Sequence, residues 1–230
     1  MTPLVLLPGL MCDARLFAPQ IAALEGTRQV TVLPLRGETV TEIAADVLAH
    51  APPVFALGGL SMGGIVAMEV LRRAPARIDR LALLDTNPLA ETPEVAARRN
   101  PQIANAQNGA LASVIRNEMK PNYLTDGPRR AAILDLCMEM ALDLGPDVFT
   151  AQSRALQTRP DQTETLRAAK LPTLILCGRD DRLCPVSRHE LMHDLMPHAT
   201  FEIIEKAGHL PTLEQPEKTT AALSRWLEAP

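Results

Sequence analysis

The sequence predicts an α/β fold, a three-layer α/β/α sandwich whose mainly parallel sheet has about six strands. Two observations predict it. Short apolar runs alternate with longer amphipathic segments, and glycine or proline follows several of the runs. A length of 230 residues suits one domain with a subordinate insertion.

Six apolar runs are the expected strands, because each is short and rich in β-branched or aliphatic residues. They are Leu4–Leu7, Val30–Leu33, Val54–Leu57, Leu81–Leu84, Thr173–Cys177 and Phe201–Ile204. The expected helices are Ala14–Leu24, Thr41–Ala49, Met62–Arg73, Ser187–Met196 and Pro216–Leu227. This alternation indicates a parallel sheet covered by helices on both faces.

Residues 87–171 interrupt the alternation, since they contain no convincing strand. Helix-like segments lie around Glu94–Gln107, Leu111–Met119 and Pro128–Leu144. So long a connection is not expected to be a bare loop in a compact domain. We interpret it as a helical cap (lid) inserted into a core formed by residues 1–86 and 172–230.

Composition narrows the partners and the location. A net charge of −4 gives no reason to expect nucleic acid or an anionic membrane surface as a partner. No apolar run approaches 18 residues, and no signal peptide is recognisable, so a cytoplasmic protein is expected. Four cysteines without C-x-x-C spacing are expected to be reduced there.

The segment Gly59-Leu-Ser61-Met-Gly63 is a G-x-S-x-G pattern between a strand-like and a helix-like run. A serine on so sharp a turn has a strained backbone, and side chains two positions away would collide. Glycine at positions 59 and 63 removes those side chains, and the following helix points its amino terminus at the serine. The pattern therefore predicts that Ser61 is a nucleophile.

A nucleophilic serine needs a histidine base, and the histidine needs an acid to hold its tautomer. His209 follows the last expected strand and thus lies at the same edge of the sheet as Ser61. Asp180 and Asp181 both follow the fifth expected strand, and one of them could be a turn or helix-capping residue instead.

The whole chain resembles the α/β-hydrolase superfamily, particularly its compact lidded esterases and the related thioesterase and lactonase-like members. The order serine, acid, histidine matches that family. In the family the acid commonly stands three residues after a glycine and four before a proline. Gly178 and Pro185 select Asp181 by that pattern, with Asp180 in reserve. The resemblance thus implies a catalytic triad of Ser61, Asp181 and His209.

The resemblance also implies an oxyanion hole formed by the backbone N–H groups of Leu10 and Met62. The first strand runs into Pro8-Gly9-Leu10, where relatives usually carry His-Gly, and this departure puts the conformation of the loop in question. The antiparallel strands that usually precede it in the family are not found in this sequence, so a sheet of about six strands, all parallel, is expected.

A competing pattern is the H-E-x-x-H formed by His189, Glu190 and His193, which can bind zinc on a helix. The extended form needs a glycine and a third histidine, and the chain has Met196 and Ala199 at those positions. We therefore favour a solvent-facing helix with coincidental histidines over a zinc hydrolase.

The expected function is hydrolysis of a carboxylic ester, thioester or lactone of a small acyl substrate, without cofactor or metal. Activity is expected to fall at acid pH as the histidine is protonated. The same fold also serves cofactor-free lyases, peroxidases and ligand-binding receptors, which remain alternatives. The cap has as many basic as acidic residues, so its net charge does not indicate whether the substrate is charged. Met119, Leu124, Met138, Met140 and Leu142 are candidate pocket residues or, equally, residues of a helix-packing core. Arg129, Arg130 and Arg154 are candidate anion contacts, although exposed arginines on helices are usually only solvated.

Overall fold

Six parallel strands form the centre of the molecule, which is described for residues 1–229 by a computed structural model. The strands are β1 (Leu4–Leu7), β2 (Val30–Val32), β3 (Phe55–Leu60), β4 (Ile78–Leu84), β5 (Thr173–Gly178) and β6 (Thr200–Ile204). Their order across the sheet is β2-β1-β3-β4-β5-β6, and every neighbouring pair is parallel. The prediction of a parallel six-stranded sheet is confirmed.

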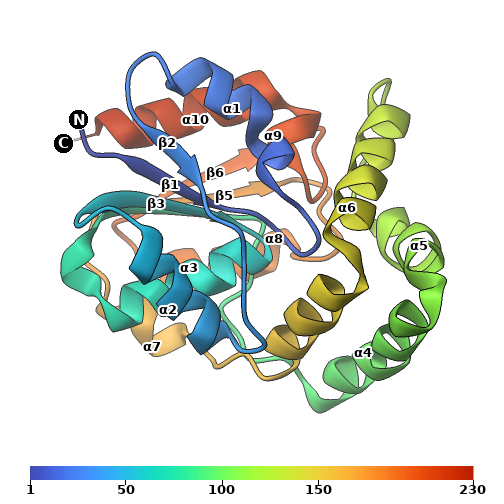
Figure 1. Cartoon of the computed structure of the whole chain (residues 1–230). Helices are drawn as coiled ribbons and strands as arrows, with labels where there is room; N and C mark the ends of the chain where they lie inside the picture. The colour runs from blue at the N-terminus through green and yellow to red at the C-terminus, as the bar shows by residue number, and fades with distance from the viewer. Residues whose placement is uncertain (230) are drawn as a thin grey trace.

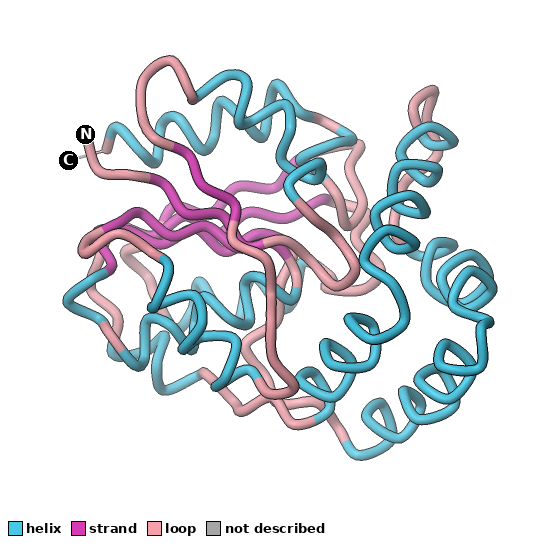
Figure 2. Tube along the Cα trace, in the orientation of Figure 1, coloured by secondary structure: helices cyan, strands magenta, loops and turns pink. Residues whose placement is uncertain are grey.

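Helices cover both faces of this sheet, which Figure 2 shows in magenta between two cyan layers. One layer contains α1 (Ala18–Leu24), α9 (Pro211–Glu214) and α10 (Pro216–Glu228), and the other contains α2 (Val40–His50), α3 (Met62–Arg73), α7 (Thr163–Ala168) and α8 (Val186–Leu195). Short 3₁₀ turns, η1 (Ala14–Phe17) and η2 (Pro75–Arg77), join some of these elements. The three-layer sandwich is therefore as predicted.

The side chains of strand β1 pack into two apolar clusters, one on each face of the sheet. Val5 and Leu7 pack into the cluster under α2 and α3, whereas Leu4 and Leu6 pack with α1 and α10. Successive side chains of a strand point to opposite faces, so a strand buried on both sides must be apolar at every position. All four residues of β1 are fully buried, which explains its continuous apolar run.

The chain between β4 and β5 is almost entirely helical, and its helices other than α7 stand beside the carboxyl edge of the sheet (Figure 1). It contains α4 (Pro93–Asn105), α5 (Leu111–Val114), α6 (Arg130–Gln157) and α7, with the irregular turns η3 (Ala106–Ala110), η4 (Ile115–Met119) and η5 (Lys120–Asn122). A third apolar cluster, which includes Ile103, Val114 and Phe149, holds these helices together. The helices of the insertion thus share a small core, to which Met11 from the loop after β1 also contributes.

Helix α6 is longer than the sequence pattern indicates. The expected segment stops at Leu144, and Gly145 does leave helical geometry, with φ of 80° and ψ of 175°. Pro146 then restarts the helix, since proline is well suited to a first helical turn. Ala155 and Leu156, after this break, pack into the main cluster under α3.

Within residues 1–229, no helix is both long and apolar enough to cross a membrane.

Candidate active site

Ser61 lies on the sharp turn that joins β3 to α3. Its φ of 54° is in the left-handed region, which a serine rarely adopts. A Cβ atom added at Gly59 would lie 2.3 Å from the carbonyl oxygen of Gly63, and one added at Gly63 would lie 2.0 Å from that of Leu7. Both glycines are therefore required by close approach, as the sequence pattern predicts.

Two residues outside the G-x-S-x-G pattern brace this turn. Thr86 Oγ1 donates a hydrogen bond to the carbonyl oxygen of Ser61 at 2.7 Å, and the backbone N–H of Thr86 donates to His189 Nε2 at 3.1 Å. His189 must be neutral at Nε2 to accept that bond. Burial supports this state, because it lowers the pKa of His189 to about 4.

His209 connects the serine to the acid. Its Nε2 lies 2.9 Å from Ser61 Oγ, and its Nδ1 lies 2.8 Å from Asp181 Oδ2. A carboxylate at Nδ1 fixes the proton there, which leaves Nε2 free to accept from the serine hydroxyl. The backbone N–H of His209 donates to the carbonyl oxygen of Tyr123 at 2.7 Å, so the helical insertion also holds the histidine.

Asp181, rather than Asp180, reaches the histidine. Its Oδ1 accepts hydrogen bonds from the backbone N–H groups of Leu183 at 2.8 Å and Cys184 at 3.0 Å. Burial opposes ionisation, but His209 and these two bonds outweigh it and lower the pKa of Asp181. Asp180 is exposed at the surface. Of the two aspartates, Asp181 is thus the one within hydrogen-bond distance of His209.

A second buried carboxyl, Asp85, lies at the end of β4 and was not singled out by the sequence. Its Oδ1 accepts from the backbone N–H of Gly178 at 2.8 Å, and its Oδ2 is buried without a partner within residues 1–229. Burial and the nearby charge of Asp181 raise the pKa of Asp85 well above its usual range. The pKa values of the two carboxyls are thus shifted in opposite directions.

Glu214 ties the histidine loop to the insertion. Its Oε2 accepts from the backbone N–H groups of Gly208 at 2.8 Å and Leu210 at 3.2 Å, on both sides of His209. Its Oε1 accepts from the backbone N–H of Thr125 at 2.9 Å. The Glu214 carboxylate therefore accepts hydrogen bonds from three backbone N–H groups. This role could not be predicted from the sequence, because it depends on the tertiary structure.

The backbone N–H groups of Leu10 and Met62 are available to a ligand, because neither donates to an acceptor within residues 1–229. Leu10 lies in a turn closed by a hydrogen bond of 3.1 Å from the N–H of Cys12 to the carbonyl oxygen of Gly9. Met11 has φ of 56°, and its N–H donates to Gln152 Oε1 at 2.9 Å. The second half of α6 thus supports this loop.

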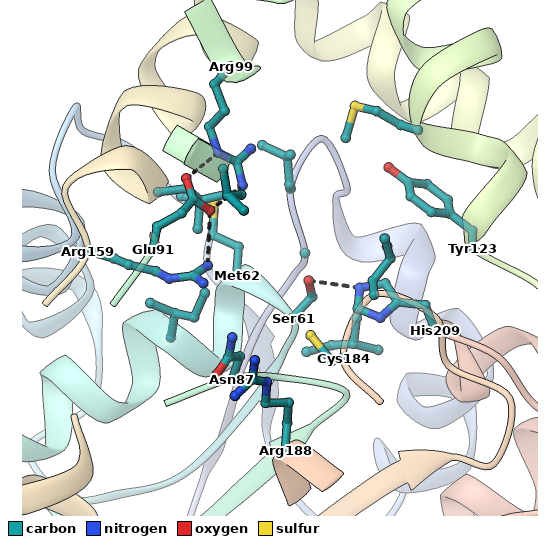
Figure 3. A pocket seen from close by; sticks show the side chains of 18 of the residues that line it. Ser61, Met62, Asn87, Glu91, Arg99, Tyr123, Arg159, Cys184, Arg188 and His209 are labelled. Atoms are coloured by element: carbon teal, nitrogen blue, oxygen red, sulfur yellow. Dashed lines mark hydrogen bonds and ion pairs between the residues drawn. The ribbon is translucent and has the colours of Figure 1, made fainter. Parts of the chain in front are cut away.

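Ser61 and His209 open into a cavity of about 560 Å³. Met119 and Tyr123 line it, as do Leu89, Met62 and Leu156 (Figure 3). Of the five apolar residues considered for its lining, the other four lie elsewhere: Met138 and Met140 are buried in the apolar clusters, as the helix-packing alternative has it, Leu142 is exposed, and Leu124 lines a separate small hollow.

The three arginines considered from the sequence also lie away from this cavity. Arg154 pairs with Glu38 at 2.9 Å, Arg129 donates to the carbonyl oxygen of Glu214 at 2.8 Å, and Arg130 lies 3.4 Å from Asp126. None of them lines the cavity beside Ser61. Their positions agree with the alternative interpretation, that they are surface arginines without a role in binding.

The H-E-x-x-H helix is only partly as expected. His189 is fully buried, whereas the sequence interpretation placed it in solvent, and its Nε2 is occupied by the N–H of Thr86. The described residues contain one group of three side chains with metal-ligand spacing, and it is Asp181, Cys184 and His209. Neither His189 nor His193 belongs to that group.

Fold and site together define a class: an α/β protein with a hydrogen-bonded Ser–His–Asp array at the carboxyl edge of a parallel sheet. The model of the Alpha/beta hydrolase family matches residues 4–223, so the chain belongs to this family. The recognition from sequence is confirmed.

Several relatives are esterases. The chain is 28% identical to a pimeloyl-[acyl-carrier protein] methyl ester esterase of Aromatoleum aromaticum, over 92% of this chain and 87% of the relative. It is also 28% identical to a thermophilic esterase of Thermogutta terrifontis, whose structure with malate bound matches with a TM-score of 0.89 over 99% of this chain and 89% of the other. An enol-lactonase of Burkholderia xenovorans shares the fold, with 21% identity and a TM-score of 0.88 over 99% and 92% of the two chains.

Proposed function

We propose that this chain hydrolyses the carboxylic ester of a small molecule through an acyl-enzyme formed on Ser61. One observation carries the proposal: the continuous array from Ser61 Oγ through His209 to the ionised Asp181, with hydrogen bonds of 2.9 and 2.8 Å. This array opens into a cavity large enough for a small organic ligand.

Acylation starts at the serine hydroxyl. His209 Nε2 takes the proton as Ser61 Oγ attacks the carbonyl carbon, and Asp181 stabilises the imidazolium that forms. The developing oxyanion accepts hydrogen bonds from the N–H groups of Leu10 and Met62. Met62 begins α3, so the positive end of the helix dipole adds to this stabilisation.

The second half of the reaction returns the enzyme to its starting state. His209 protonates the departing alkoxide, which leaves as an alcohol, and the acyl group stays on Ser61. A water molecule then gives its proton to His209 and attacks the acyl carbon, and collapse of this second intermediate releases the acid. No step requires a cofactor or a metal ion.

The names of the relatives favour an ester over the other acyl compounds. One group acts on the methyl ester of a pimeloyl-acyl-carrier protein, and another relative is named only as an esterase. We extend to this chain the shared part of those names, hydrolysis of a carboxylic ester. Thioesters and lactones require the same attack and are further candidates.

We assign the helices of residues 87–171 the role of a cap over the site, with residues 1–86 and 172–230 as the hydrolase core. The contacts of Tyr123 and Thr125 with the histidine loop support this division. The cytoplasmic location expected from the sequence stays a prediction.

The test uses wild type, Ser61→Ala and Ser113→Ala, the last being an exposed serine on α5. Each is purified in parallel, checked for folding, and assayed with short-chain p-nitrophenyl esters. Loss of a triad nucleophile costs on the order of 10⁴- to 10⁶-fold in kcat. We expect a fall of that size for Ser61→Ala and wild-type turnover for Ser113→Ala.

A covalent probe gives an independent test that Ser61 is the nucleophile. A fluorophosphonate should add one label to wild type at Ser61, found by peptide mass spectrometry, and none to Ser61→Ala. Equal esterase activity in wild type and Ser61→Ala would contradict the proposal. Ligand binding by Ser61→Ala together with negligible turnover by wild type would favour a receptor instead.

A further inference from the structure

The cavity beside Ser61 has an excess of positive charge. Its lining contains the arginines Arg98, Arg99, Arg159 and Arg188 and the glutamates Glu91 and Glu118. Arginines that line a ligand cavity are well suited to bind carboxylate or phosphate groups. We call Arg99, Arg159, Arg188 and Glu91 the arginine wall.

Glu91 neutralises only part of this wall. Its side chain is 2% exposed and accepts two hydrogen bonds from Arg99, at 2.7 and 2.8 Å. Arg159 Nη1 lies 3.5 Å from the same carboxylate, and Arg159 Nε donates to the carbonyl oxygen of Leu89 at 3.0 Å. A single negative charge is thus shared between two guanidinium groups.

Arg188 has no such partner. Within residues 1–229, its guanidinium makes neither a hydrogen bond nor an ion pair, although the residue is half-buried. Burial lowers the pKa of Arg159, Glu91 opposes the shift, and the charges of Arg99 and Arg188 add to it. The cations of the wall therefore repel one another, and a bound anion would relieve this repulsion.

The position of the wall relates it to one part of an ester. In Figure 3, His209 lies on one side of Ser61, Glu91 and Arg159 lie on the other, and Arg188 lies beneath with Asn87. The leaving oxygen must face His209 to receive its proton. The acyl chain, which leaves the carbonyl carbon in another direction, is then the part that meets Arg188.

We propose that the substrate carries a carboxylate in its acyl part and that Arg188, supported by Arg159, binds it. The substrate class is the monoester of a dicarboxylic acid. This inference rests on the proposed function, since it places the carboxylate relative to an ester held at Ser61.

The charge balance favours a carboxylate over a phosphate. Arg99 is matched by Glu91, and Arg98 is exposed, which leaves Arg188 as the one half-buried arginine of the cavity lining that has no counter-ion among residues 1–229. A planar guanidinium pairs with a single carboxylate through two parallel hydrogen bonds. A phosphate dianion would need a full positive charge from Arg159 as well, and Glu91 already neutralises part of that charge.

The experiment compares two substrates that differ in one charge, the monomethyl and dimethyl esters of adipic acid. Methanol release gives kcat/KM for each, and p-nitrophenyl acetate is assayed in parallel. We expect wild type to prefer the monoester by at least about 10-fold, the lower end for a charge-assisted hydrogen bond. The preference should shrink as ionic strength rises.

The variants are Arg188→Gln and, as matched control, Arg154→Gln, an exposed arginine that pairs with Glu38 outside the cavity. Arg188→Gln should lower the monoester-to-diester ratio by about 10- to 100-fold, mainly through KM of the monoester. Arg154→Gln should keep the wild-type ratio. Free adipate should inhibit wild type competitively at lower concentration than inorganic phosphate, and Arg188→Gln should weaken this inhibition.

Several outcomes would overturn the carboxylate subsite. They are a wild type that hydrolyses the diester as well as the monoester or hydrolyses neither, an Arg188→Gln variant with the wild-type ratio, and stronger inhibition by phosphate than by adipate. An equal preference for 4-acetoxybutyrate over its methyl ester would instead move the carboxylate to the alcohol part and contradict the acyl assignment. Failure of the proposed function is distinct, because p-nitrophenyl acetate would then show no hydrolysis that depends on Ser61.

Discussion

The two sides of the cavity are built in different ways. The triad wall, formed by Ser61, Asp181 and His209, comes from loops that follow β3, β5 and β6, and backbone groups hold two of its members. The arginine wall comes from α8, the end of α6, and the segment around α4. The three side chains of the triad wall are hydrogen-bonded to one another, whereas Arg188 in the arginine wall has no counter-ion among residues 1–229.

This difference indicates that the two walls have different roles, catalysis for the triad wall and choice of substrate for the arginine wall. Parallel strands fix the positions of their carboxyl ends through the register of the sheet, so three loops deliver three groups to one point. Helices of the insertion have no such common frame, and their side chains set the shape and charge of the space above. The triad wall should therefore control kcat for every ester, while the arginine wall should control which ester is preferred.

The largest expected effect is on the triad wall. Asp181→Asn should lower kcat by about 10⁴-fold for neutral and charged esters alike, because an amide at Nδ1 favours the wrong tautomer of His209. The matched control is Asp180→Asn, an exposed neighbour that should stay within about 3-fold of wild type. A large loss in Asp180→Asn with little in Asp181→Asn would reverse the assignment.

Acid should weaken the fold through His189, which lies on α8 next to Arg188. The unfolded chain protonates this histidine near its ordinary pKa of 6.5, whereas the folded chain keeps it neutral down to a pKa of about 4. The unfolded state therefore binds more protons in this window, and the free energy of unfolding falls by about 2 kcal/mol between pH 7 and pH 5.

Urea unfolding at both pH values measures this fall. His189→Gln keeps an acceptor for the N–H of Thr86 but cannot be protonated, so its pH dependence should be smaller by that amount. His50→Gln, at the exposed end of α2, should behave as wild type. An unchanged pH dependence in His189→Gln would show that another group is responsible.

The oxyanion turn should depend on the insertion. Gln152→Leu removes the acceptor for the N–H of Met11, which leaves the turn at Leu10 less well fixed. We expect kcat to fall about 10-fold with KM little changed, since the oxyanion forms only in the transition state. Gln157→Leu, on the same helix but bonded to Ala96 and Asn100, should keep wild-type kcat. A loss confined to KM would argue against this role.

The smallest effect is expected at Asp85. Burial and the charge of Asp181 raise the pKa of this carboxyl, and Asp85→Asn keeps the acceptor for Gly178 N–H in an uncharged side chain; kcat should stay within about 3-fold of wild type. Asp85→Ala leaves that buried N–H without a partner and should lower the free energy of unfolding by about 1–3 kcal/mol. A loss in Asp85→Asn as large as in Asp181→Asn would mean that Asp85 acts as a charged group.

The fold and the three residues of the triad wall could be predicted from sequence because their signals are local. Apolar runs encode the strands, and G-x-S-x-G encodes the turn at Ser61 through the space that two glycines vacate. His209 follows the last strand, where any loop residue reaches the same edge. The position of each group follows from the topology alone.

The groups that support and complement the triad have no such signal. Glu214, Gln152 and His189 act through bonds to residues far away in the sequence or in a loop whose shape is set by packing. The insertion has equal numbers of basic and acidic residues, so its net charge gives no sign that several of its arginines line the cavity. Arg188 lies outside the insertion altogether, so no count over residues 87–171 includes it.

The break at Gly145 marks where the insertion could be exchanged. The residues after it belong to the machinery of the core, because Ala155 and Leu156 pack under α3 and Gln152 fixes the oxyanion turn. A chimera that takes its helices from another family member keeps these contacts if the junction lies at Gly145. A junction at the end of the insertion would discard Gln152 along with them. The incoming helices must in turn supply the backbone contacts that Tyr123 and Thr125 make with the histidine loop.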